Sequence, residues 1–151
     1  MIALLIALAT AAPAVRTISY ETGPCFGICP SYKVTVSSDG RGVFEGKRFT
    51  AVKGVRRFRI APAQWRAFTD RLRGLHGRGA ADLTGPPLCE AMATDMSTVE
   101  VVWSGAWRPF TLRANYGCQT KGQGWMLTHL RLAPAALPIA AFIGRPGTAP
   151  R

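Results

Sequence analysis

Acidic residues and histidine are scarce in this sequence, which has eight Asp and Glu and two His among 151 residues. Hydrolytic enzymes need a nucleophile beside a base, or two carboxylates that divide acid and base between them. Glu90, Asp95 and Glu100 are close in the sequence, but strand alternation directs Glu100 outward and Asp95 opens a strand. No catalytic set emerges, so the sequence favours a protein that is not an enzyme and uses no cofactor.

A long apolar run is also missing after residue 14, so no later segment is predicted to span a membrane. The first fourteen residues, MIALLIALATAAPA, are uncharged and apolar and end in small residues, as a secretory signal does. They lack the Lys or Arg that usually begins such a signal, and a retained N-terminal helix is the alternative. We expect a signal peptide over residues 1–14, cleavage after Ala14, and a periplasmic or secreted protein.

The rest of the chain predicts a single domain over residues 15–132, followed by an irregular Pro/Ala-rich tail over 133–151. Asp39-Gly40 stands between two β-rich runs and predicts a hairpin. A second hairpin is predicted to turn at Ser104-Gly105.

Helical spacing of apolar residues occurs twice. Pro62 suits the first turn of a helix, and the apolar spacing continues to residue 75. A shorter helix is predicted over about 123–132. Along the chain, the predicted elements occur in the order strands, helix, strands, helix. This order favours an α+β fold, with an antiparallel sheet of about five strands and two helices on one face.

Basic residues dominate the charge, with a formal net charge of +11 to which fifteen Arg and four Lys contribute. Such a protein attracts anionic partners, although codon bias in a GC-rich gene would give the same composition. Basic residues flank Phe58 as they do in single-strand nucleic-acid binders, but alternation turns Phe58 inward, so nucleic-acid binding is not favoured. A polyanion-binding surface is an alternative function, and its candidate residues are Arg56, Arg57, Arg59, Arg66, Arg71 and Arg73.

Four cysteines behind a predicted export signal indicate two disulfides rather than free thiols. They permit three pairings, and the sequence alone does not choose among them. If Thr98 faces Arg113 across the second hairpin, Cys89 and Cys118 lie near each other beyond its open end. That pairing leaves the two remaining cysteines to close a short loop.

This remaining pair, Cys25 and Cys29, also has two chemical alternatives. A thioredoxin-type redox site has two residues between its cysteines and a helix that begins beneath them, whereas here three residues intervene and a strand is predicted next. Zinc sites use close cysteine pairs, but the other cysteines are isolated, and we expect His76 in an exposed loop and His129 on a helix surface. A thiol-disulfide oxidoreductase is therefore a further alternative, and no metal ligands are assigned.

The segment around this pair is predicted to form a rigid turn between two strands, because glycine permits a bend and proline fixes the exit. Thr94-Asp95 lies between the long loop and the second hairpin, where an Asx turn competes with a functional carboxylate. The candidate motif residues, functional or structural, are Phe26, Gly27, Pro30, Tyr32, Thr94 and Asp95.

Four short motifs occur in an order that resembles a bacterial family of exported proteins, domain of unknown function 6438. They are CFGICPSYKVTV at 25–36, DGRGVFEG at 39–46, TDMSTVEV at 94–101 and YGC at 116–118. The resemblance covers about residues 16–132 and implies an exported or lipid-anchored envelope protein. It also implies that Cys25 pairs with Cys29 as an independent unit, because some members carry only that pair. It implies no activity.

Taken together, these patterns favour a non-enzymatic binding or scaffolding module of the bacterial envelope. The expected contact surfaces are a sheet edge and the long loop over residues 76–95, which is rich in Gly and Pro. The expected partner is an envelope protein or an anionic ligand.

Overall fold

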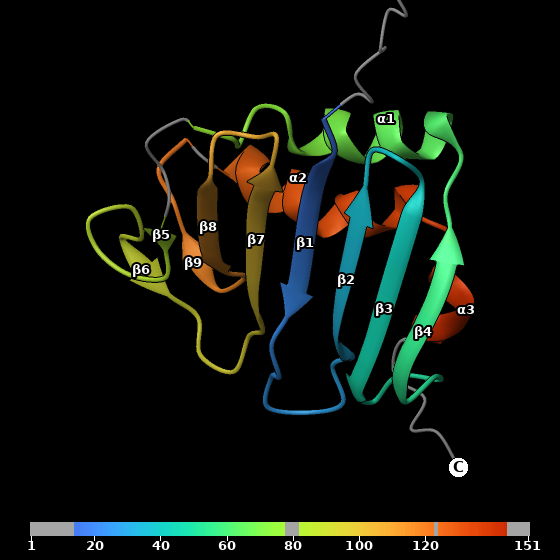
Figure 1. Ribbon diagram of the computed structural model, residues 1–151. Helices are drawn as coiled ribbons and strands as arrows, with labels where there is room; N and C mark the ends of the chain where they lie inside the picture. The colour runs from blue at the N-terminus through green and yellow to red at the C-terminus, as the bar shows by residue number, and fades with distance from the viewer. Residues whose placement is uncertain (1–13, 78–81, 123, 145–151) are drawn as a thin grey trace, which may run out of the picture.

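A seven-stranded sheet forms the front layer of the protein, and helices cover its rear face (Figure 1). The computed structural model describes residues 14–77, 82–122 and 124–144. The strand order is β4-β3-β2-β1-β7-β8-β5, and a separate two-stranded sheet pairs β6 with β9. The strands are β1 (Arg16–Thr22), β2 (Ser31–Ser37), β3 (Arg41–Arg48), β4 (Gly54–Arg59), β5 (Asp82–Leu83), β6 (Ala91–Met92), β7 (Thr98–Gly105), β8 (Phe110–Asn115) and β9 (Cys118–Gln119).

Strand β1 lies at the centre of the sheet, antiparallel to both β2 and β7. Tyr20 of β1 pairs with Val34 on one side and with Val101 on the other, and all three side chains are buried under the helices. Alternation then directs the intervening polar side chains to the opposite face, which no helix of the described residues covers. The period-2 pattern of the sequence therefore places the core on one face only.

The first predicted hairpin is present, with β2 and β3 joined through Asp39-Gly40. Gly40 has φ 85°, in the left-handed region that glycine enters without steric cost. The Asp39 carboxylate accepts hydrogen bonds from Ser37 Oγ and the Arg41 backbone N–H. The bond from the Ser37 hydroxyl is the main reason that the pKa of Asp39 is lowered. Local side-chain chemistry thus fixes this turn.

The sheet differs from the predicted one in strand number and in direction. Seven strands replace about five, and β5 runs parallel to β8, so the sheet is mixed. The register of the second hairpin also differs, because Thr98 faces Asn115 rather than Arg113. The pairing between β7 and β8 ends at Trp103↔Phe110, which leaves Pro109 in the connection. A shift of two residues keeps every side chain on its predicted face, so alternation could not detect it.

The helical layer contains α1 (Pro62–Leu72), α2 (Gly124–Leu132), a 3₁₀ turn η1 (Ala133–Ala136) and α3 (Ala140–Ile143). Trp65, Phe68 and Leu72 form the buried stripe of α1, as the helical spacing predicts. The helix ends three residues before the predicted residue 75, but Leu75 is still buried. At the other end, Gln64 Oε1 accepts the Ala61 N–H at 2.8 Å.

Residues 133–144 pack into the core, although the sequence predicts an irregular tail there. Leu137 and Ile139 are 5% and 1% exposed. The carbonyls of Phe142 and Ile143 accept backbone N–H groups from Val52 and Ala51, which joins α3 to the loop between β3 and β4. Prolines divide this segment into helical pieces of four residues each, which are too short for a helical period to be recognised.

Within the three described ranges, no helix combines the length and the apolar character that a membrane crossing requires. The predicted signal peptide falls almost entirely on residues outside those ranges.

We predict that Ile139→Ala lowers the free energy of unfolding by about 2–5 kcal/mol, because it removes a side chain from a closely packed core. Leu132→Ala is the matched control in the same segment, since Leu132 is 54% exposed, and it should cost about 0.5 kcal/mol. Urea denaturation of the oxidised protein, followed by tryptophan fluorescence, measures both. Equal losses for the two variants would contradict the packing of this segment.

Candidate functional site

The loop between β1 and β2 is closed by the Cys25–Cys29 disulfide, whose Cα atoms are 5.7 Å apart. Gly27 has φ 147°, a backbone conformation that other residues rarely adopt, and its N–H donates to the Cys25 carbonyl at 3.0 Å. The loop lies at the lower end of the sheet in Figure 1. The disulfide and the glycine together give this loop a tight bend, as the sequence predicts.

The base of the loop is tied to β1 through Thr22. The Thr22 hydroxyl donates to the Pro30 carbonyl at 2.9 Å and accepts the Tyr32 N–H at 3.2 Å. Ser31 Oγ donates to the Thr22 carbonyl at 3.1 Å. Because Pro30 has no N–H of its own, these three bonds around it fix where the chain leaves the loop.

A neighbouring turn fastens the same loop from the side. The Phe26 N–H donates to the Asp95 carbonyl at 3.1 Å, and the Gly23 N–H donates to the Thr98 carbonyl at 2.8 Å. Asp95 has φ 69°, which Asp tolerates better than most residues do. Its carboxylate accepts a hydrogen bond from the Thr94 hydroxyl at 3.3 Å. The backbone of Asp95 therefore positions the disulfide loop, and its exposed carboxylate lies beside it.

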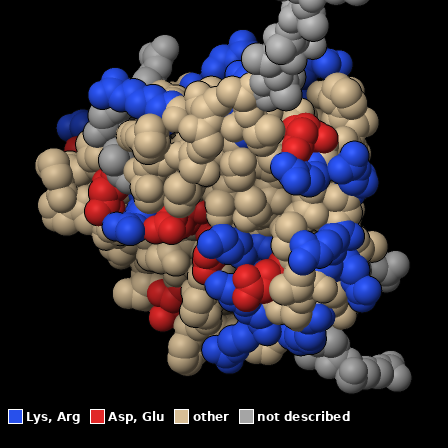
Figure 2. Space-filling model, viewed as in Figure 1, with Lys and Arg blue, Asp and Glu red and all other residues tan. Residues whose placement is uncertain are grey.

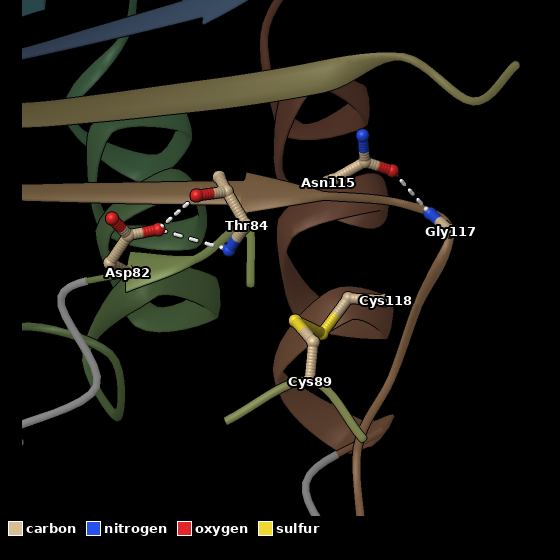
Figure 3. The surroundings of a disulfide bond; sticks show 6 residues. All are labelled: Asp82, Thr84, Cys89, Asn115, Gly117 and Cys118. Atoms are coloured by element: carbon tan, nitrogen blue, oxygen red, sulfur yellow. Dashed lines mark hydrogen bonds between the residues drawn. A yellow bond between two sulfur atoms is a disulfide. The ribbon is translucent and has the colours of Figure 1, made fainter. Parts of the chain in front are cut away.

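The second disulfide, Cys89–Cys118, joins the long loop to the start of β9 (Figure 3). It is the pairing that the hairpin argument favours, with its Cα atoms 5.2 Å apart. Ala93 N–H donates to the Gly117 carbonyl at 2.8 Å, and a side chain at Gly117 would lie 2.2 Å from the Ala93 carbonyl oxygen. The backbone of the long loop approaches residue 117 so closely that only glycine fits there. This contact connects the long loop to the start of β9.

Apolar side chains project from the loop and the turn into solvent. Phe26 is 88% exposed, Ile28 43% and Met96 42%. We call these three residues the apolar tip. The sequence singles out Phe26 but not Ile28 or Met96, because an isolated apolar residue in a loop gives no sign of its exposure. Exposed apolar groups that lie together commonly mark interaction sites.

All three tyrosines of the chain meet just behind the loop. The Tyr20 hydroxyl donates to the Leu130 carbonyl at 3.0 Å and lies 2.8 Å from the Tyr116 hydroxyl. Since Tyr20 has only one proton to donate, Tyr116 donates to it. The rings of Tyr20 and Tyr32 are stacked with centroids 6.4 Å apart. Burial raises the pKa of each of the three hydroxyls above its usual value.

The six arginines of the predicted anion-binding surface do not form one patch. Alternation places Arg57 and Arg59 on the open face of β4 and Arg56 on the other face. Basic side chains are dense over β3 and β4 in Figure 2. Arg66 and Arg73 lie instead in a cleft beside α1, and Arg71 donates to the Leu132 carbonyl.

The carboxylates of β1 and β7 on the open face of the sheet are already paired. Glu100 points outward, as alternation predicts, and accepts a hydrogen bond from Arg113 at 2.7 Å. Glu21 lies opposite Glu100 and is paired with Lys33 and Lys47. These carboxylates therefore stabilise neighbouring strands and are not arranged as an acid and a base.

His76 is half-buried, contrary to the expectation of an exposed loop residue. Its ring centroid lies 5.1 Å from that of Trp103 and 5.3 Å from that of Trp107, and Nε2 is 3.0 Å from the Arg108 carbonyl. His129 lies on the exposed side of α2, as predicted, with Nδ1 2.9 Å from the Arg71 carbonyl. Among the residues that the structure describes, no group of three or more His, Cys, Asp or Glu could hold a metal ion.

The surroundings of Cys25 and Cys29 lack one feature of thiol oxidoreductases. Strand β2 begins at Ser31, two residues after Cys29, and no helix in the described ranges begins at either cysteine. A helix N-terminus lowers the pKa of an attacking thiol, so this common means of activation is missing here.

Comparison with known proteins identifies one related group. A family model described as Domain of unknown function (DUF6438) matches residues 16–129. No curated protein and no solved structure matches the chain. The matched range includes the disulfide loop, the Asp95 turn and all four cysteines.

We predict that the protein loses stability as the pH rises above about 10, where tyrosines of the unfolded chain ionise. Burial raises the pKa of Tyr32, so the folded state keeps a proton that the unfolded state releases, and the free energy of unfolding falls with increasing pH. Each such tyrosine contributes up to about 1.4 kcal/mol per pH unit. Urea denaturation between pH 8 and about pH 11 measures the slope.

Tyr32→Phe is the control, because it removes one of the raised groups and leaves the Tyr20–Tyr116 hydrogen bond in place. Above pH 10, the free energy of unfolding of this variant should fall less steeply with pH, by the contribution of one tyrosine. The contributions of lysine are the same in both proteins and cancel in the comparison. Phenolate absorbance at about 295 nm should appear only as the protein unfolds. Early ionisation of the folded protein, or equal slopes, would contradict the cluster.

Proposed function

Because the chain belongs to the family described as Domain of unknown function (DUF6438), which assigns no activity, we propose a function from the site alone. The protein is a non-enzymatic binding module of the bacterial envelope, and the apolar tip is the surface that contacts a partner protein. The two disulfides support an oxidising compartment, since cytosolic proteins rarely keep such bonds.

The exposure of Phe26 carries this proposal. A phenylalanine that is 88% exposed contributes nothing to the core of its own domain. Its transfer into a partner's apolar pocket would be favourable by about 1.5–3 kcal/mol. The disulfide, Gly27 and the Asp95 carbonyl already hold the loop in one conformation. Binding therefore costs little ordering entropy, which is the property of a pre-organised contact residue.

The charge around the tip favours a protein over an anionic membrane as the partner. The loop from Gly23 to Tyr32 has no Lys or Arg, and the exposed Asp95 carboxylate lies beside it. Segments that insert into anionic bilayers combine apolar residues with basic ones. Of the two contact surfaces that the sequence predicts, the long loop contributes to the tip through Asp95. The sheet edge at β4 carries three arginines, and charged residues on an edge strand discourage the addition of a further strand.

The proposal predicts that a photo-crosslinking phenylalanine analogue at position 26 captures a defined protein in a bacterium that expresses this chain. The matched control carries the same analogue at Val55, which is 62% exposed on β4 at the sheet edge. Adducts are identified by mass spectrometry. A synthetic, disulfide-closed peptide of residues 23–32 should compete with the adduct at position 26.

The pattern of adducts decides the outcome. The same proteins captured from both positions would rule out the tip as a specific contact surface. If insulin-reduction activity is present and is lost in Cys25→Ser, the oxidoreductase alternative replaces this proposal.

A second candidate function, polyanion binding, is favoured by the cleft between α1 and the upper end of the sheet. The cleft has a volume of about 550 Å³ and contains Arg16, Arg66 and Arg73 together with Trp65 and Trp107. The Arg16 guanidinium lies 5.0 Å from the centre of the Trp107 ring. Within the described ranges only Arg73 of these arginines forms an ion pair, with Asp70. Unpaired guanidinium groups beside aromatic rings suit acidic polysaccharides.

This candidate predicts that Arg66→Gln/Arg73→Gln elutes from heparin at lower salt than the unmodified protein. Arg57→Gln/Arg59→Gln removes the same charge from the open face of the sheet and is the matched control. A cleft-specific site requires the larger shift in the first variant, because the number of counterions released on binding scales with the number of anionic groups that the arginines neutralise. Equal shifts would mean that net charge alone causes retention.

A further inference from the structure

A cavity of about 490 Å³ lies between the tyrosine cluster and the segment that follows α2. This volume falls within the range of small-molecule sites in proteins. Its walls are mainly aliphatic and come from two sides. The end of β1 contributes Thr22, and Pro30 lies just before β2. The C-terminal segment contributes Pro134, Leu137, Ile139 and Ile143.

Two polar groups in this apolar lining are free to bind a ligand. The Tyr20 hydroxyl is not one of them, because it is already hydrogen-bonded to Tyr116 and to the Leu130 carbonyl. The first is Tyr32, a residue that is 6% exposed and lines the cavity, and no hydrogen bond between described residues involves its hydroxyl. A ligand in the cavity could accept the proton of this hydroxyl.

The second polar group is Arg131, the only charged residue that lines the cavity among those the structure describes. Its guanidinium lies 4.8 Å from the centre of the Tyr116 ring, and its side chain is exposed at the opening. No Asp or Glu of the described ranges lines the cavity, and no ion pair of Arg131 occurs within them. Arg131 therefore supplies a single positive charge at the side of an open, mainly apolar pocket.

From this arrangement we propose that the cavity binds an amphiphilic carboxylate, with its acyl chain against the aliphatic walls and its head group at Arg131. Aliphatic walls suit a flexible hydrocarbon chain. A carboxylate forms charge-assisted hydrogen bonds with guanidinium in a planar, two-pronged geometry. The Tyr32 hydroxyl supplies a further donor inside the cavity. This site is separate from the apolar tip, and it stands whether or not the tip binds a protein.

The test is isothermal titration of the full, oxidised protein with sodium decanoate below its micelle concentration. Decanoate should bind, while decyltrimethylammonium, with the same chain and the opposite charge, should bind at least about tenfold more weakly. Butyrate should show no binding, because its chain reaches too little of the wall. Absence of decanoate binding, or equal binding of the two decyl compounds, would overturn the proposal.

Variants locate the site. Ala140→Trp fills the cavity from α3 and should abolish binding, whereas Ala141→Trp adds the same group at an exposed neighbour outside the lining and should not. Arg131→Gln should weaken decanoate binding by about tenfold or more, as expected for the loss of a hydrogen bond to a charged group. Unfolding curves check that each variant folds. Because Arg131 is exposed, its variant keeps the test decisive if Ala140→Trp does not fold.

A second arm separates free carboxylates from membrane lipid as the source of the acyl chain. Phosphatidylglycerol vesicles are sedimented with the unmodified protein, with Ala140→Trp and with Ala141→Trp. A free carboxylate predicts decanoate binding without any cavity-dependent sedimentation. Sedimentation lost only in Ala140→Trp would overturn a soluble ligand and assign the cavity to bilayer lipid.

Discussion

The rest of the structure depends on the hydrogen bonds of the Tyr20 hydroxyl, which connect three parts of the molecule. Tyr20 belongs to the central strand, Tyr116 follows β8, and Leu130 belongs to α2. One buried hydroxyl thus fixes the helical layer against the sheet at the end where the disulfide loop begins. In a site of low dielectric such bonds are strong, and their loss would leave the Leu130 carbonyl unsatisfied. The same cluster forms one side of the cavity, opposite the C-terminal segment.

The two disulfides differ in what they stabilise. Cys89–Cys118 joins residues 29 positions apart, and by lowering the entropy of the unfolded chain it raises the free energy of unfolding by about 3.6 kcal/mol in the loop-entropy account. Cys25–Cys29 spans four positions and removes little entropy from the unfolded state. Its effect is local, since it fixes the shape of one loop. The first bond supports the loop that carries Asp95, and Asp95 in turn holds Phe26.

Much of the fold follows from local signals in the sequence. The Asp39-Gly40 turn, the buried stripe of α1 and the inward position of Phe58 rest on neighbouring residues and alternation, and they are observed. Strands β5, β6 and β9 have two residues each, too few for any period to appear. Their pairing is set by tertiary contacts and by the second disulfide.

The candidate site is harder to predict for the same reason. Alternation places Tyr20 and Tyr32 on the inner face, but their meeting with Tyr116 requires the order of the strands. The exposure of Ile28 and Met96, and the approach of Arg131 to Tyr116, join residues that are far apart in the chain. The aliphatic wall comes from a proline-rich segment that carries no periodic signal.

Thr22 and Pro30 have two structural roles, because they fix the base of the disulfide loop and also form one wall of the cavity. A ligand that shifted Pro30 would also shift the loop that carries Phe26, because the hydrogen bond from Thr22 to Pro30 fixes the base of that loop. Thermodynamic reciprocity then requires that a protein bound at Phe26 alter the affinity of the cavity by the same factor. The base of the disulfide loop thus lies between an open pocket and the exposed Phe26, and the stiffness of the disulfide would determine how far a shift at one is felt at the other.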